Sequence, residues 1–340
     1  MSSGKHGSPV QMATSVCERL GIDLPIILAP MGGAVGPELA AAVSNSGGLG
    51  ILPVWCMDID NTRASIRATK ALTSAPFAVN LNMDFPQEEL LEACLEEGAT
   101  IISFFWQDPA PLIGRAKDAG AIVMHTVGDA DAAKRAVDSG VDVIVAQGWE
   151  AGGHVRGMVA TMALVPAVVD RVGDVPVVAA GGIADGRGLA AALALGAGAG
   201  WIGTRFLASE EATIHPDYRK HVLESSENDT VYLTDLFDGG WPDAPHRVIR
   251  NSTVAAWEAA GRPRAGERPG EGEVIATSPS LGAMTRYGTY TPRADFTGEI
   301  EALSMWAGQT SALVRRVQPA AEIVREIMAE ARNVITALAV

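Results

Sequence analysis

The sequence predicts an α/β protein, a (β/α)8 barrel of the TIM type with a smaller inserted and C-terminal segment. Eight short apolar segments alternate with eight segments of helical pattern between residues 24 and 223. The apolar segments are continuously apolar rather than alternating, which is typical of strands buried on both faces of a parallel sheet. Eight repeats of a strand and a helix favour a closed barrel over an open doubly wound sheet.

Each predicted strand is a short apolar run that is followed by a turn or a polar stretch. The predicted strands are Leu24–Met31, Leu49–Leu52, Phe77–Leu81, Thr100–Trp106, Ala121–Thr126, Val141–Ala146, Val175–Ala180 and Gly200–Phe206. Helix starts are indicated by Pro37 at a first turn and by Asp185 as an N-cap. The predicted helices are Leu39–Ser46, one within Asn61–Leu72, Gln87–Glu97, Ala110–Ala119, Ala130–Ser139, Thr161–Val172, Gly188–Leu195 and one from Pro216 to about Leu223.

The alternation of predicted strands and helices divides the chain into four parts. Residues 1–13 are Ser- and Gly-rich and are predicted to be a flexible tail, and residues 14–226 form the barrel. Residues 227–302 are predicted to be an insertion or lid, because 261–300 hold seven glycines and four prolines without periodicity. The helical pattern returns at about Leu303, so residues 303–340 are expected to form a helix that packs back on the barrel.

Composition restricts the class of protein. The formal net charge is −14, which opposes a nucleic acid or an anionic membrane as partner. The three cysteines lack metal-type spacing, which indicates a reducing compartment, and no metal site is predicted. No apolar stretch approaches membrane-spanning length, and the first residues lack the apolar core of a signal peptide. We therefore expect a cytoplasmic enzyme or binding protein.

The chemistry is predicted to lie in the stretch Ala146–Gly157, a Gly-rich loop that follows a buried strand. Its only imidazole is His154, whose near-neutral pKa suits proton abstraction or anion recognition, so we predict His154 to be catalytic. Glu150 is a possible base, although a capping or orienting role is the favoured interpretation. Arg156 is a possible anion ligand, although a solvated surface position is favoured.

Two further loops predict a phosphate site. Ala180-Gly181-Gly182-Ile183 ends the seventh strand, and Gly203-Thr204-Arg205 ends the eighth. In barrels of this type these loops commonly bind phosphate through backbone N–H groups. The alternative is two tight turns needed only for packing. The occurrence of both at these strands favours phosphate.

Polar residues at other strand ends point to a heterocyclic ligand at the same mouth. Small residues at Ala29–Gly33 would let a flat ring approach, although this stretch is also compatible with an ordinary turn. Buried polar side chains need hydrogen-bond partners, so they either cap the barrel mouth or contact a ligand. Four polar side chains lie at strand ends on one face of the predicted barrel: Asn80, Asn82, His125 and Gln147. A shared ligand explains them better than four separate accidents.

Taken together, these motifs resemble those of the nitronate monooxygenase (2-nitropropane dioxygenase) family, which is FMN-dependent. The similar segments are Ala29–Gly32, Ala78–Leu81, Gln147–His154, Ala180–Gly186 and Gly203–Phe206. The resemblance extends from about residue 20 to 225 and resumes at Trp306–Gln309. Flavin-dependent enoyl-acyl-carrier-protein reductases share the Gly-Gly-His loop. One departure is Val155, which stands between His154 and Arg156, where many members have Arg directly after His.

The resemblance implies FMN bound at the C-terminal mouth of the barrel. It implies contacts to the ring and ribityl chain from Ala29, Pro30, Met31, Asn82, His125 and Gln147. It places the phosphate at Gly181, Gly182, Gly203 and Thr204, and further cofactor contacts at Gly152, Gly153, Ala180 and Gln309. His154 matches the catalytic histidine of the family.

The expected activity is oxidative denitrification of alkyl nitronates, or of nitroalkanes, with O2 to a carbonyl compound and nitrite. The expected partners are therefore a small nitronate and O2, and a homodimer is possible. One alternative is an NAD(P)H-dependent FMN reductase of enoyl thioesters or quinones, in which His154 would donate a proton. A third interpretation, from a different class, is a barrel that binds a phosphate ligand without redox activity.

Overall fold

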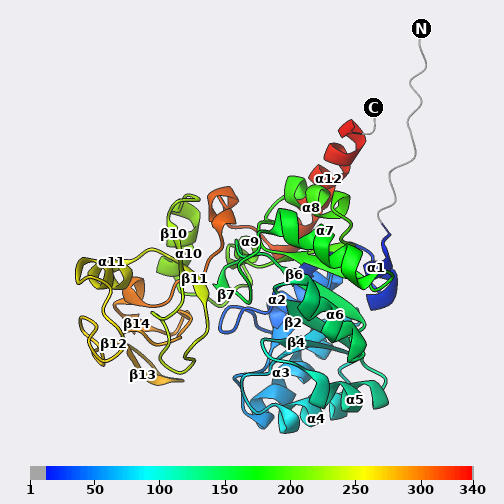
Figure 1. Ribbon diagram of the computed structural model, residues 1–340. Coiled ribbons are helices and arrows are strands. Elements are labelled where there is room, and N and C mark those ends of the chain that lie inside the picture. The colour runs from blue at the N-terminus through cyan, green and yellow to red at the C-terminus, as the bar shows by residue number, and fades with distance from the viewer. Residues whose placement is uncertain (1–12, 339–340) are drawn as a thin grey trace.

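The computed structural model describes residues 13–338, so all of the predicted tail but its last residue lies outside the described part. Eight parallel strands form one sheet in the order β1-β9-β8-β6-β5-β4-β3-β2. Leu28 N–H donates to Leu49 O (2.9 Å) and Leu49 N–H donates to Ile26 O (3.0 Å), which joins β1 to β2. The predicted (β/α)8 barrel is thus confirmed (Figure 1). Its strands are β1 Ile26–Leu28, β2 Gly50–Pro53, β3 Phe77–Asn82, β4 Ile101–Phe105, β5 Ile122–Val127, β6 Val143–Gln147, β8 Val177–Ala180 and β9 Ala199–Ile202.

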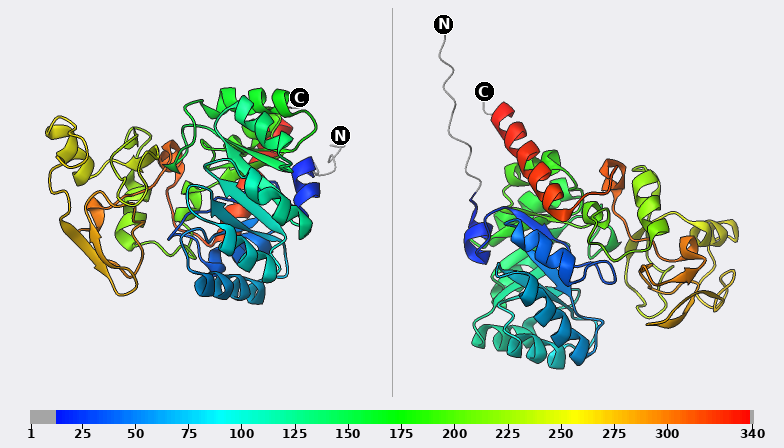
Figure 2. Two further views of the ribbon diagram at one scale, coloured as in Figure 1. Left: turned by 60° about the horizontal axis from the view of Figure 1, so that its bottom comes forward. Right: turned by 180° about the vertical axis from the view of Figure 1, so that it is seen from behind.

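Helices surround this barrel, as Figure 2 shows from two sides. They are α2 Pro37–Asn45, α3 Ile59–Leu72, α4 Glu88–Glu96, α5 Ala110–Asp118, α6 Ala130–Asp138, α7 Thr161–Val172, α8 Gly186–Ala194 and α12 Ala320–Leu338. The short helix α9 Thr204–Leu207 follows the last strand, and α10 Pro216–Glu224 contacts it on the side of the insertion. One side-chain layer lies between strands and helices, and a second fills the barrel. The second layer includes Val16, Cys17 and Leu20 of a short helix that the sequence pattern did not predict, α1 Ser15–Leu20.

The structure corrects two predicted element boundaries. The eighth strand ends at Ile202 rather than Phe206, because the chain turns at Gly203 into the helix α9. The C-terminal helix begins at Ala320 rather than near Leu303. Pro319 precedes it and disfavours a helical conformation at Gln318. As expected, α12 packs back on the barrel, against α8 and α2. No helix within residues 13–338 is long and apolar enough to cross a membrane.

The insertion forms a small structure beside the barrel mouth (Figure 1). Two of its strands, β10 Thr230–Leu233 and β11 His246–Ile249, pair antiparallel, and β11 also pairs with β7 Gly153–His154 of the barrel loop. The pairing of β11 with β7 places the insertion directly at the predicted catalytic histidine. A second sheet has the order β13-β12-β14. The remaining elements are α11 Ser252–Ala259, β12 Val274–Ser278, β13 Gly282–Thr285, β14 Thr297–Gly298 and two 3-10 helices, η1 Ile300–Ala302 and η2 Gln309–Leu313.

Candidate active site

A pocket opens at the C-terminal ends of the barrel strands, where TIM-type enzymes carry their active sites. Its empty volume is about 1270 Å³, including the part open to solvent. The predicted site residues on its wall are Ala29, Pro30, Met31, Asn82, Gln147, Gly152, Gly153, His154, Ala180, Gly181, Gly182, Gly203 and Thr204. Their roles toward a cofactor stay predictions.

Two predicted residues, His125 and Gln309, are not on the wall. Successive side chains of a strand point to opposite faces, and Val123 and Val127 pack in the outer layer between strands and helices. His125 shares their register, and its Nδ1 lies 3.2 Å from Phe104 O. Thr126 takes the position on the wall instead. Gln309 begins a short 3-10 helix, Gln309–Leu313, and is also absent from the wall, although its neighbours Gly308 and Thr310 line the pocket.

Burial of His125 gives the folded state a dependence on pH. It lowers the pKa of this imidazole to about 4, so the folded protein keeps it neutral while the unfolded chain protonates it below pH about 6.5. The free energy of unfolding therefore falls as pH falls through this window. Between pH 7 and pH 5 the loss from His125 is about 2 kcal/mol.

We expect a His125→Gln variant to lose less stability than the parent protein between pH 7 and pH 5. Urea denaturation at both pH values measures the change in the free energy of unfolding between them. The comparison of these changes cancels any cost of the substitution that does not depend on pH. Val127→Ala, which removes no titratable group from the same strand, is the control and should keep the parental pH dependence. An unchanged pH dependence in His125→Gln would contradict the assignment.

His154 lies at the centre of an aromatic environment. Its ring centroid is 3.8 Å from that of Trp241 and 5.1 Å from that of Trp306. Among the described residues its Nε2 has no hydrogen-bond partner, although the atom is buried. Burial, with a contribution from nearby His246, holds the pKa of His154 well below its ordinary value. The imidazole is thus neutral and has a free nitrogen for a ligand.

The backbone of the Gly/His loop is fixed from both sides. Gln147 Nε2 donates to His154 O (3.1 Å), and Gln147 Oε1 accepts from Arg156 N–H (2.9 Å). The intervening Val155 is buried and donates its N–H to Pro245 O (2.8 Å) in the insertion. Arg156 itself is exposed, with its guanidinium carbon 5.4 Å from the Trp106 ring centroid. The extra residue Val155 therefore serves the contact with the insertion, and Arg156 does not line the pocket.

Glu150 has the capping role that sequence reasoning favoured. Its carboxylate accepts from Thr161 N–H (3.0 Å) and from Thr161 Oγ1 (3.0 Å) at the start of α7. A carboxylate at a helix N-terminus is stabilised by the free N–H groups there. Thr161 Oγ1 also lies within hydrogen-bond distance of Gly181 O (3.0 Å), so the cap connects the catalytic loop to the glycine pair.

The glycine pair and Asn82 provide the groups that a bound cofactor would need. Gly181 and Gly182 have φ of 88° and 74°, which side-chain-bearing residues rarely adopt. Asn82 Oδ1 accepts from Asp84 N–H (3.1 Å), whereas its buried Nδ2 has no partner within residues 13–338. Buried donors without partners are costly. The free nitrogens of Asn82 and His154, both on this wall, therefore fit a heterocyclic ligand with hydrogen-bonding atoms.

Sequence reasoning missed most of the aromatic wall and all of the wall contributed by the insertion. Phe105 and Thr126 lie at strand positions whose side chains point into the barrel. The alternation of side chains along a strand could therefore have predicted both residues on the pocket wall. Trp241, Thr289 and Thr291 come from the insertion, where no local pattern indicated the pocket. The wall residues without a predicted role in the site include Trp55, Phe105, Thr126, Trp201, Trp241, Thr289, Thr291 and Trp306.

Fold and pocket together define a (β/α)8-barrel protein with a ligand site at its C-terminal mouth. The chain matches the nitronate monooxygenase family over residues 14–93 and 83–330. It belongs to that family, whose members are flavin-dependent oxidoreductases.

Relatives in the family carry different activities. A nitronate monooxygenase of Paraburkholderia phytofirmans is 34% identical, over 94% of this chain and 95% of its own. A (3aS,4S,5R,7aS)-5-hydroxy-7a-methyl-1-oxo-octahydro-1H-indene-4-carboxyl-CoA dehydrogenase of Mycobacterium tuberculosis is 39% identical, over 75% of this chain and 71% of its own. Among solved structures, FabK of Thermotoga maritima matches with a TM-score of 0.78 and 32% identity, over 96% of this chain and 98% of that one.

Proposed function

We propose that the protein binds FMN and oxidises alkyl nitronates with O2 to a carbonyl compound and nitrite. The observation that carries this proposal is the neutral imidazole of His154, whose buried Nε2 lacks a partner among the described residues of the pocket. A neutral imidazole can donate a hydrogen bond to a nitronate oxygen without forming a permanent ion pair. The nitronate monooxygenase relatives support the same chemistry.

The chain offers groups suited to each part of FMN. Asn82 Nδ2 would contact the ring, while Gly181, Gly182, Gly203 and Thr204 would hold the phosphate. FMN, when bound, supplies the electron-accepting chemistry, and the protein supplies orientation and electrostatics. Thr204 Oγ1 also accepts from Gly308 N–H (3.0 Å), which ties the proposed phosphate loop to the C-terminal segment.

The role of His154 in the reaction follows from its environment. It would orient the nitronate oxygens or, for a neutral nitroalkane, accept the α-proton at Nε2. Trp241 and Trp306 flank the ring and exclude water from it. In the overall reaction each carbon–nitrogen bond breaks, each carbon gains one oxygen atom derived from O2, and nitrogen leaves as nitrite, so that one O2 is consumed for two nitronates.

A second candidate function is flavin-dependent redox chemistry on a coenzyme A ester. The 39% identity to a carboxyl-CoA dehydrogenase favours it. In that case His154 would act as a base or proton donor near the carbon skeleton of the acyl group. The same neutral imidazole serves both candidates, so the choice between them depends on the substrate.

An anaerobic absorbance titration of the purified protein distinguishes the candidates. We expect rapid bleaching of the flavin by a nitronate such as the anion of 2-nitropropane, and slow or no bleaching by NADH or NADPH. Bleaching by NAD(P)H alone, with reoxidation by an enoyl thioester, would instead support a reductase. Bleaching by a hydroxyacyl-CoA alone would support the dehydrogenase. A colourless protein that binds no FMN would contradict all three.

A further inference from the structure

We propose that Trp241 determines substrate specificity, by closing an aromatic enclosure around His154 that selects substrates with an apolar ring at the reacting carbon. The enclosure consists of Trp55, Phe105, Trp241 and Trp306, all on the pocket wall. As a statement about nitronates this inference rests on the proposed function. The preference for an apolar ring can be tested by measurements of ligand binding, without any measurement of turnover.

The enclosure is built from four separate parts of the chain. Trp55 follows β2, Phe105 ends β4, Trp241 belongs to the insertion and Trp306 precedes α12. The Trp241 ring centroid lies 5.6 Å from that of Trp55 and 6.5 Å from that of Phe105. Trp241 therefore contacts both His154 and the rings of Trp55 and Phe105, so the rings form one connected aromatic group on the pocket wall.

Trp241 is held in place by the barrel. Its indole N–H donates to Asp84 Oδ2 (2.6 Å), on the loop after β3. Asp84 Oδ1 in turn accepts from Gln107 Nε2 (3.0 Å). The side chain of Trp241 is 4% exposed. A side chain fixed this way loses little further freedom when a ligand binds, which favours a well-defined specificity wall.

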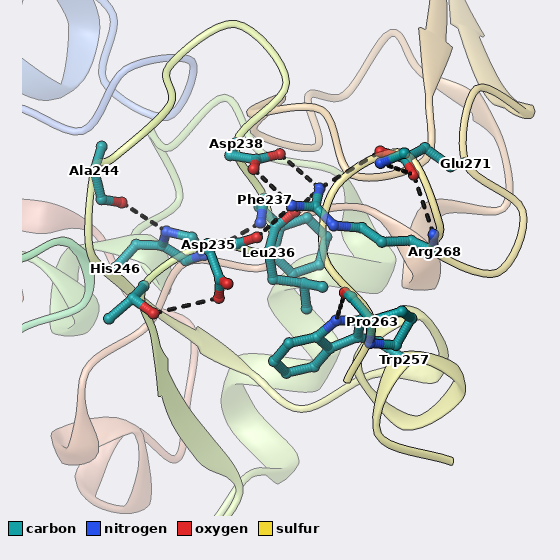
Figure 3. A network of polar contacts seen from close by, with 12 residues as sticks. Asp235, Leu236, Phe237, Asp238, Ala244, His246, Trp257, Pro263, Arg268 and Glu271 are labelled. Atoms are coloured by element: carbon teal, nitrogen blue, oxygen red, sulfur yellow. Dashed lines mark hydrogen bonds and ion pairs between the residues drawn. The ribbon is translucent and has the colours of Figure 1, made fainter. Parts of the chain in front are cut away.

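Within the insertion, a buried arginine holds the segment that precedes Trp241, and Figure 3 shows its contacts. Arg268 is buried and pairs with both carboxylate oxygens of Asp238 (2.7 Å each), and it also donates to Leu236 O (3.2 Å). Gly239 N–H donates to Tyr287 O (3.0 Å), which connects the loop to the segment that carries Thr289. The backbone around Trp241 is therefore preformed.

The charges around the enclosure favour an uncharged group. His154 is neutral, and the carboxylate of Glu150, the acidic group on the pocket wall, is bound to the start of α7. A charged substituent elsewhere on the substrate, away from the reacting group that His154 would bind, would be buried there without a counterion, at high cost. Flat indole faces instead give a ring-shaped apolar group extensive contact. A substrate with a long alkyl chain would need open space at the point where Trp241 and Trp306 approach the imidazole.

The test compares cyclic and small ligands on the flavin-loaded protein. Binding of cyclohexanone and of acetone is measured by perturbation of the flavin absorbance, and KM is measured for the anions of nitrocyclohexane and nitroethane. We expect the cyclic member of each pair to bind about tenfold more tightly in the parent protein. Trp241→Ala should reduce this ratio to below about threefold, and Trp241→Phe should keep part of it. An unchanged ratio in Trp241→Ala would overturn the proposal.

Two further comparisons separate specificity from general damage. Tyr232→Leu alters a ring that packs on Trp149 (5.5 Å) away from the pocket wall, so the ratio should persist. Asp84→Leu should lower the ratio, and Asp84→Asn, which keeps an acceptor for the indole, should restore it. A ring preference in ketone binding without nitronate turnover would leave this inference standing and remove the proposed function. Nitronate turnover without any ring preference would support the proposed function and overturn this inference.

Discussion

Replacing His154 with alanine is expected to lower kcat for nitronate oxidation by about 10²-fold or more, the usual contribution of a positioned acid–base or hydrogen-bonding group. The substitution removes the one buried imidazole whose Nε2 is free within the described pocket. Steady-state oxygen consumption with a nitronate measures the change. The flavin should stay bound, because the proposed phosphate loops are untouched, and visible absorbance of the purified variant checks this.

His154→Gln is the matched variant for this prediction. Its side-chain amide can donate a hydrogen bond but cannot act as a proton acceptor near neutral pH. If His154 acts as a donor to the nitronate, the glutamine variant should recover part of the lost turnover. If it removes a proton, the variant should recover none with neutral nitroalkanes. Parental kinetics in His154→Ala with the flavin bound would rule out any role in catalysis.

Gly152→Ala is expected to damage both the stability of the catalytic loop and its binding of the flavin. A Cβ at this position would lie 2.3 Å from Gly308 N and 2.4 Å from the carbonyl carbon of Ala307, both backbone atoms. Relief of the clash requires the loop and the C-terminal segment to separate. We expect a loss of about 3 kcal/mol in the free energy of unfolding, together with weaker flavin binding. Urea denaturation and a flavin titration measure the two effects.

The adjacent Gly153→Ala is the control. Its φ is 69°, which costs a non-glycine residue about 1 kcal/mol, but a Cβ there would meet no atom of the described chain within 4 Å. It should therefore cost much less than Gly152→Ala. Equal losses in both variants would indicate that backbone conformation, rather than the contact with Gly308, limits this loop.

Much of the barrel was predictable because its signals are local. A strand such as Val143–Gln147 is an apolar run ended by a glycine loop, and a helix such as Gly186–Ala194 follows an N-cap, Asp185. These signals place the pocket as well, since parallel strands direct their C-terminal ends to one mouth. The predicted wall residues from Ala29 to Thr204 lie there for that reason.

The errors have equally specific causes. His125 was included because it ends a strand, but the period of two places Thr126 on the wall. Trp241 gave no signal because its place depends on Asp84, which lies far away in sequence, and on the pairing of β11 with β7. The strands of the insertion are short and rich in turn residues, and their partners are set by the tertiary structure. Local patterns cannot specify such contacts.

The joining of β7 to β11 has a consequence for the order in which the protein is made. All eight barrel strands precede Gly203, yet the pocket also needs Trp241, Thr289, Trp306 and Thr310. A nascent chain can therefore complete its barrel strands well before His154 acquires its surroundings. Activity should emerge only once nearly the whole polypeptide has left the ribosome.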